Sequence, residues 1–207
     1  MIHGHHVIMG LYGFWLPNDP RGSWSAFVGA WELLRFGRTT RRADRTPLIT
    51  AEERYQRAQA KNALKYPPVV LTGAQAQSIA RGFASFCAKQ RLTIWACSIL
   101  PEHVHLVIAR FRYDVEIVAN QLKGAATKQL RKDKLDPMMA FARPDGEIRS
   151  PWARGQWCQF LDHELTIEES LYYVEDNPSK EGKPRQQWSF VSPFTGIEGG
   201  GLIGYPF

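Results

Sequence analysis

Cysteine is scarce in this sequence, with three among 207 residues and no C-x-x-C pair. The three are widely spaced, at Cys87, Cys97 and Cys158, and their odd number excludes a framework of disulfides. The same spacing argues against a zinc site made of thiolates. Because aromatic or apolar residues flank each cysteine, we expect all three to be packing residues.

Long hydrophobic runs are also lacking. No apolar stretch approaches the roughly 20 residues that span a bilayer. The first residues, 1–6, have neither the basic start nor the apolar segment of a secretory signal. Hydrophobic residues make up 44% and charged residues 22% of the chain, which excludes wholesale disorder. We therefore expect a soluble, cytoplasmic protein with no membrane partner.

Positive charge is in excess and is clustered. The net charge is +6, and the basic residues gather in three groups: Arg35, Arg38, Arg41, Arg42 and Arg45; Lys123, Lys128, Arg131, Lys132 and Lys134; and Lys180, Lys183 and Arg185. Such clusters indicate a polyanionic partner, of which nucleic acid is the commonest. The alternative is that they are solvated faces of helices and loops.

Hydrophobic periodicity and capping residues predict the order of elements. A capping box of Thr50 and Glu53 starts a polar helix that ends near Lys65, and Thr72 is the N-cap expected for a second, amphipathic helix. A further amphipathic helix is expected over 115–130. A capping box of Thr166 and Glu169 starts the last expected helix, which Pro178 ends at Asn177. Strands are expected over four apolar or alternating stretches, namely 7–12, 92–100, 103–109 and 156–161.

This order predicts an α+β protein. It matches the ferredoxin-like βαββαβ plan, an antiparallel sheet with helices on one face, followed by a C-terminal helix. We expect a single domain over residues 1–191 with a long insertion at about 13–70. Residues 192–207, rich in glycine, are expected to be a loosely ordered tail.

The tripeptide His103-Val104-His105 lies in one of these strands. Residues i and i+2 of a strand share a sheet face, about 7 Å apart along the backbone, so the two imidazoles can converge on one metal ion. Val104, Leu106 and Ile108 then line the opposite face. Taken alone, the motif is equally compatible with a pair of histidines that binds nothing.

Tyr173 and Asn177 are four residues apart on the last expected helix, so they lie one above the other on the same helical face. Tyr172 is rotated by about 100° from Tyr173, which favours core packing for it. A helix crossing the strand of His103 and His105 would bring two ring nitrogens, an amide oxygen and a phenol around one point.

The run Pro-Glu-His103-Val-His105-Leu-Val resembles the H-hydrophobic-H signature of the single-tyrosine HUH transposases, the IS200/IS605-like group. Tyr173-Val-Glu-Asp-Asn177-Pro resembles the helix of that group in which a tyrosine precedes Gln or Asn by four residues. Asn-Pro in place of Gln, together with Tyr12-Gly-Phe-Trp-Leu-Pro-Asn-Asp-Pro-Arg-Gly-Ser, is similar to the REP-associated tyrosine transposases. The resemblance spans roughly residues 6–191.

The resemblance implies metal-dependent cleavage and strand transfer of single-stranded DNA next to hairpins. Mg²⁺ or Mn²⁺ would be held by His103, His105 and Asn177, and Tyr173 would form a 5′-phosphotyrosine. The second amphipathic helix would contact phosphates through its outer face, with the basic residues Lys123, Lys128, Arg131 and Lys132. It also implies a monomer or homodimer associated with the nucleoid.

Several alternatives stay open from the sequence. The first alternative is a domesticated hairpin binder that does not cleave DNA. The second is an HUH replication initiator or relaxase, and the third is an unrelated metallohydrolase. Trp24 and Trp31 in the insertion either stack on unpaired bases or, as we favour, pack locally. His3, His5 and His6 are interpreted as a mobile terminus, with the alternative for His6 that it lies near the end of the sheet. His163 is interpreted as a loop residue or a general base.

Overall fold

Four antiparallel strands form one sheet in the order β2-β3-β1-β4 in the computed structural model, which describes residues 1–20, 22–23, 25, 27–40 and 49–197. The strands are β1 (Gly4–Gly10), β2 (Ile94–Ile99), β3 (His103–Ala109) and β4 (Trp157–Leu161). This strand order and the antiparallel pairing confirm the ferredoxin-like plan. The first strand begins three residues earlier than its sequence pattern predicts.

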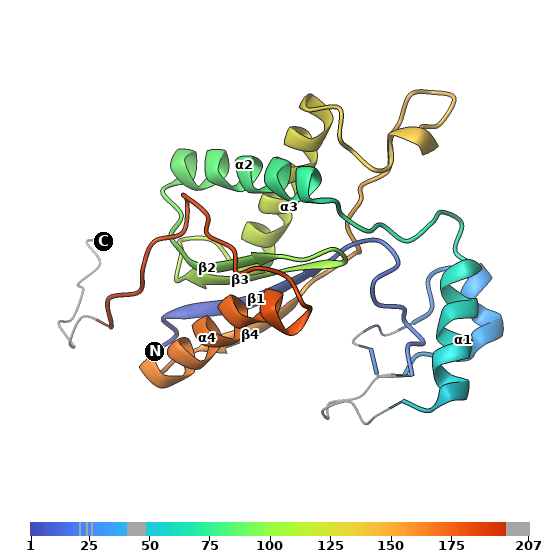
Figure 1. Ribbon diagram of the computed structural model, residues 1–207, viewed down its shortest axis with the longest axis horizontal. Coiled ribbons are helices and arrows are strands. Elements are labelled where there is room, and N and C mark those ends of the chain that lie inside the picture. The colour runs from blue at the N-terminus through green and yellow to red at the C-terminus, as the bar shows by residue number, and fades with distance from the viewer. Residues whose placement is uncertain (21, 24, 26, 41–48, 198–207) are drawn as a thin grey trace.

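Two amphipathic helices cover one face of the sheet (Figure 1): α2 (Gly73–Gln90) and α3 (Val115–Lys132). Alternating residues of β3 point into this layer, and Val104, Leu106 and Ile108 are buried there as the alternation predicts. Phe83 of α2 and Leu122 of α3 complete the main core. Burial of these apolar side chains is what holds the two helices to the sheet.

The helix α4 (Glu164–Lys180) lies on the opposite face (Figure 1). A second, smaller core forms between this helix and the sheet, with Ile167 and Val174 packing on Ala96, Val107 and Leu161. The helix runs through Pro178 to Lys180, so the expected end at Asn177 is wrong. A proline in the last turn removes one hydrogen bond there without preventing the helical backbone from continuing.

The segment between β1 and α2, residues 13–70, forms an arm beside the sheet (Figure 1). It contains the 3₁₀ helix η1 (Trp31–Phe36) and α1 (Ala51–Asn62), which begins at the expected capping box of Thr50. Leu16, Leu33 and Ala60 form its own small core. That this segment is an insertion within a single domain stays a prediction. Its residues Trp24, Arg41, Arg42 and Arg45 lie outside the described residues.

The chain after α4 runs back along the edge of the sheet. The backbone N–H of Ser192 donates to the carbonyl of Ile94 over 2.9 Å, and the Phe194 ring packs edge-on against Trp95. Residues 192–197 therefore contact the sheet, although the sequence predicts a loose tail from 192. The rest of that expected tail, 198–207, lies outside the described residues. A further 3₁₀ turn, η2 (Met139–Phe141), follows α3.

Candidate active site

His103 and His105 share the sheet face that α4 covers, as the strand alternation predicts. Their ring centroids are 4.8 Å apart, and His105 is buried. The ring of Phe14, from the start of the arm, stacks on His103 at 4.4 Å with an interplanar angle of 13°. The two imidazoles are thus close enough to serve one ligand, and an aromatic ring covers the outer one.

His6 joins this pair from β1, and it is a site residue that sequence reasoning missed. Its Nε2 lies 3.1 Å from Nδ1 of His105, and both rings are buried. The expectation of a mobile terminus is wrong for His6, because β1 extends back to Gly4. Extending the strand alternation by two residues from Ile8 would have placed His6 on the face of His103 and His105.

Burial keeps the imidazoles of His6 and His105 uncharged at neutral pH. It lowers the pKa of His6 to about 4. The pKa of His105 lies well below its ordinary value, chiefly through burial and further through the neighbouring His103 and His6. A neutral imidazole offers a nitrogen lone pair to a metal or a proton, whereas a charged one does not.

Tyr173 of α4 faces the same histidines. Its ring centroid lies 5.6 Å from that of His105 and 5.7 Å from that of His6, and the residue is 42% exposed. The Lys180 ammonium lies 4.8 Å from the centre of the Tyr173 ring. A phenol that is both exposed and beside the histidines is accessible to an incoming substrate.

Tyr172 turns away from this site, as the helical rotation predicts, but the expectation that it packs in the core is wrong. It is 66% exposed, because the buried side of α4 is formed by Ile167, Ser170 and Val174. The two adjacent tyrosines therefore have different surroundings, and Tyr173 is the one beside the histidines.

Asn177 lies one helical turn after Tyr173 and is buried. Its Nδ2 has no hydrogen-bond partner among the described residues. Within the described part of the chain, no three or more His, Cys, Asp or Glu residues group closely enough to hold a metal, so a site here needs the amide. Imidazole nitrogens and an amide oxygen are donor types that Mn²⁺ or Mg²⁺ accepts, so His103, His105 and Asn177 are the candidate ligands of such an ion by their chemistry.

The expected phosphate-binding face of α3 is only partly exposed. Lys123 is 7% exposed, and its ammonium donates to the carbonyls of Ala153 and Gly155, so its placement on the outer face is wrong. Burial lowers its pKa to about 8. Lys123 therefore ties α3 to the loop that leads into β4.

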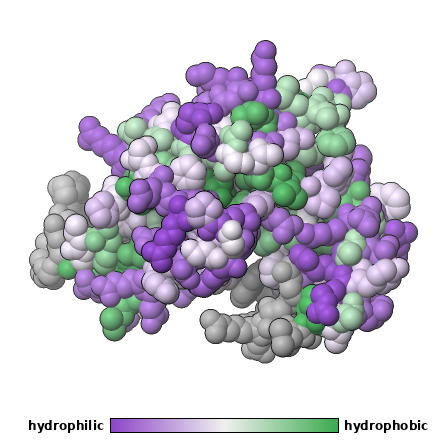
Figure 2. Space-filling view, viewed as in Figure 1, coloured by the Kyte–Doolittle hydropathy of each residue, from purple (hydrophilic) through white to green (hydrophobic). Residues whose placement is uncertain are grey.

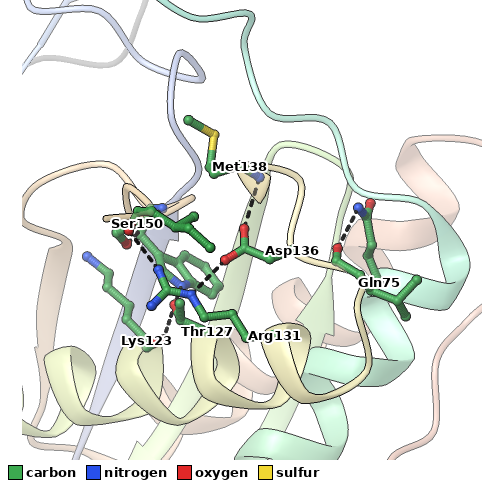
Figure 3. Close-up of polar contacts among 10 residues, drawn as sticks. Gln75, Lys123, Thr127, Arg131, Asp136, Met138 and Ser150 are labelled. Atoms are coloured by element: carbon green, nitrogen blue, oxygen red, sulfur yellow. Dashed lines mark hydrogen bonds and ion pairs between the residues drawn. The ribbon is translucent and has the colours of Figure 1, made fainter. Parts of the chain in front are cut away.

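Arg131 also makes structural contacts, shown in Figure 3. Its guanidinium pairs with the buried Asp136 at 3.0 Å and donates to the carbonyl of Ile148 at 2.8 Å. Lys128 and Lys132 are exposed. A hollow of about 650 Å³ lies between α3 and the loop, lined in part by Thr127, Lys128, Ser150 and Arg154.

The remaining expected groups lie away from the histidines. His163 is exposed and caps α4, whose Thr166 hydroxyl donates to its carbonyl at 2.7 Å. All three cysteines are free, with Cys87 and Cys97 buried and Cys158 half-buried. Across the described ranges, no helix has the length and apolar character needed to cross a membrane.

A family model and two solved structures resemble the chain, whereas no curated protein matches it. The model of the family described as "Transposase IS200 like" matches residues 61–177, which include both strand histidines, Tyr173 and Asn177. A REP-associated tyrosine transposase bound to a REP hairpin is 13% identical with a TM-score of 0.48, covering 92% of this chain and 76% of that one. A proposed transposase of Deinococcus radiodurans R1 is 11% identical with a TM-score of 0.41, covering 83% and 88%.

Proposed function

The chain belongs to the IS200-like transposase family, and from that premise we propose that it cleaves and rejoins single-stranded DNA through a phosphotyrosine intermediate. The observation that carries the proposal is the position of the exposed Tyr173 ring, 5.6 Å from His105 and 5.7 Å from His6. Membership of the family makes the protein a DNA-processing enzyme.

Tyr173 is the nucleophile in this proposal. Its hydroxyl oxygen loses a proton and bonds to phosphorus as the bond from phosphorus to the 3′ oxygen breaks. The products are a 5′-phosphotyrosine and a strand with a free 3′-hydroxyl, which takes up a proton. Because one phosphodiester replaces another, a second 3′-hydroxyl can reverse the step on a different end without ATP.

His103, His105 and Asn177 would hold Mg²⁺ or Mn²⁺. When bound, such an ion polarises the scissile phosphate and stabilises charge on the departing 3′ oxygen. Nδ1 of His105 contacts His6, so His105 would bind the ion through Nε2. Nε2 has a free lone pair only when the proton of the ring is on Nδ1. We therefore assign the 3.1 Å hydrogen bond to donation from Nδ1 of His105 to Nε2 of His6. His6 orients the ligand without touching the ion.

The DNA substrate would run over the basic side of α3. Lys128 and Lys132 are exposed and would supply phosphate contacts, Lys128 from the lining of the hollow between α3 and the loop of Arg154. Lys123 is left out of this assignment because its ammonium is bonded to two carbonyls. A hairpin beside the cleavage site is proposed from the resemblance to REP-associated transposases.

The test is a denaturing gel that detects a covalent protein–DNA adduct. The protein is incubated with Mn²⁺ or Mg²⁺ and single-stranded oligonucleotides drawn from the palindromes that flank its gene. We expect a metal-dependent adduct that Tyr173→Phe abolishes and that the matched control Tyr172→Phe leaves largely intact, because only Tyr173 faces the histidines.

His103→Ala separates chemistry from binding in the same assay. It should abolish the adduct and leave hairpin binding nearly unchanged, because the basic residues of α3 are separate from the histidines. Loss of the adduct in Tyr172→Phe but not in Tyr173→Phe would overturn the assignment of the nucleophile. Tight hairpin binding with no adduct, under both metals and with every flanking palindrome, would instead favour a hairpin binder that does not cleave.

A further inference from the structure

The arm presents large apolar side chains to solvent. Trp31 is 82% exposed and Leu34 is 60% exposed, both on η1. Residues three apart in a 3₁₀ helix lie on the same side, so the two form one surface. The sequence favours local packing for Trp31, and that prediction is wrong. A tryptophan with most of its ring in water is costly unless a partner covers it.

The arm also carries most of the net positive charge of the protein. Residues 13–70 contain ten Lys or Arg and five Asp or Glu, which leaves +5 of the chain's net +6. Arg57 forms an ion pair with Asp19, and Lys61 forms one with Glu102. Arg35 and Arg38, next to Trp31 in sequence, are exposed and form no ion pair with any described residue. Figure 2 shows a mostly hydrophilic surface over the arm, with separate hydrophobic residues among the polar ones.

The arm is fixed to the strand that bears the candidate metal ligands. The Lys61 ammonium pairs at 2.7 Å with Glu102, the residue before His103, and Phe14 stacks on the His103 ring. The two ends of the arm meet where the N–H of Val69 donates to the carbonyl of Tyr12 over 2.9 Å. A ligand on the arm is therefore held at a set position relative to His103.

We propose that the arm is the hairpin-recognition element of this protein, with Trp31 stacking on an unpaired base and Arg35 and Arg38 holding phosphates. Positive charge together with an exposed aromatic ring suits a nucleic acid with unpaired bases better than a protein partner. Residues 13–60 lie outside the part of the chain that the family model matches, which fits a role in target choice. The inference rests on the proposed function, because it names the substrate feature that the arm recognises.

The experiment measures DNA binding in a Tyr173→Phe background, so that cleavage does not enter. The probe is a fluorescein-labelled DNA hairpin with a thymine loop and thymine flanks, and the reference probe is the same stem as a blunt duplex. We expect Trp31→Ala to weaken hairpin binding about fivefold or more and to leave duplex binding unchanged. Arg35→Ser with Arg38→Ser should lower the slope of log affinity against log salt by about two.

Matched controls come from exposed residues outside the arm. Phe160→Ala removes an exposed ring from β4, and Lys89→Ser with Arg110→Ser removes two exposed charges. Neither control should change hairpin binding by as much as twofold. Equal weakening by the arm variants and these controls, or no weakening by Trp31→Ala, would overturn the inference. Circular dichroism checks that each variant is folded.

Two outcomes separate this inference from the proposed function. An adduct with the wild-type protein, together with unchanged hairpin binding in Trp31→Ala, would overturn the role of the arm and leave the proposed function standing. The absence of an adduct in every condition, together with loss of hairpin binding in Trp31→Ala, would overturn the proposed cleavage chemistry. The same result would support hairpin recognition by the arm. If Trp31→Ala instead changes the molar mass measured by light scattering and leaves hairpin binding intact, the surface is a contact between two copies and the inference is wrong.

Discussion

A single hydrogen bond between two buried histidines determines which nitrogen of His105 is available. Burial disfavours the charged form of both rings, so the pair shares one proton along the 3.1 Å contact between them. Donation from His105 leaves its Nε2 open, and donation from His6 closes it. In the proposed metal site, the role of His6 would therefore be to select the tautomer of His105.

His6→Phe tests this role, because it keeps an aromatic ring and removes the acceptor. We expect Mn²⁺ affinity, measured by electron paramagnetic resonance, to fall about 10- to 100-fold. In the ¹⁵N spectrum, the His105 signals should shift toward a mixture of tautomers. His5→Phe is the matched control, because His5 is the neighbouring residue on the opposite face, beside Phe160. An unchanged Mn²⁺ affinity in His6→Phe would refute the role.

Sequence patterns predict the orientation of His103 and His105 but not the burial of Lys123 or the position of His6. The spacing of His103 and His105 predicts their shared face, because strand alternation is a local property. Nothing local indicates that Lys123 is buried, since the carbonyls it binds belong to a loop 30 residues later. His6 was missed for a related reason: three histidines at a chain end lack the apolar alternation that marks a strand.

At the scale of elements, local signals predicted two helix starts and missed a third. The capping box at Thr50 and the N-cap at Thr72 are both present, and Thr72 also forms a reciprocal capping box with Gln75. The expected start at Thr166 is wrong, because α4 begins at Glu164 with His163 as its N-cap. The end of α4 and the exposure of Tyr172 were not predicted, because both depend on how that helix packs against the sheet. The contact between α2 and α3 was likewise not predicted, although Gly82 lies in it.

Gly82 and Gly124 give opposite predictions for the same substitution. A Cβ on Gly82 would lie 2.9 Å from the carbonyl oxygen of Ala125 and from Cα of Ala126, so α3 must shift to admit it. We expect Gly82→Ala to lower the free energy of unfolding by about 1 to 2 kcal/mol. A Cβ on Gly124 meets nothing within 4 Å, so Gly124→Ala should raise it by about 0.5 to 1 kcal/mol.

Urea unfolding followed by circular dichroism measures both changes as shifts of the midpoint at constant slope. If Gly82→Ala were as stable as the wild type, α2 and α3 would be farther apart than they are here. Destabilisation by Gly124→Ala would mean that this side of α3 is covered.

At the scale of the whole molecule, the buried histidines make stability depend on pH. The pKa of His6 is about 4 when folded and near 6.5 in the unfolded chain, so the unfolded state binds more protons between these values. The free energy of unfolding should therefore be flat above about pH 7 and fall as the pH drops through 6.5 toward 4. Protonation of His6 alone lowers the free energy of unfolding by on the order of 1 to 2 kcal/mol between pH 7 and pH 5.

Urea unfolding at several pH values, in the presence of a chelator, tests this dependence. His6→Gln should flatten the fall between pH 7 and pH 5, whereas His163→Gln should leave it unchanged because His163 is exposed. A fall of the same steepness in His6→Gln would show that other groups govern the acid limit.

The meeting of Tyr12 and Val69 at the base of the arm has a consequence for how such proteins diversify. A segment that leaves and returns at one point can be lengthened, shortened or exchanged while the rest of the chain keeps its path, because the entropy of closing a loop grows only with the logarithm of its length. The arm can therefore be replaced as a unit. With the arm as the proposed hairpin-recognition element, descendants of one ancestor would acquire new DNA targets by changing the arm alone, while Tyr173 and the histidines stay unchanged.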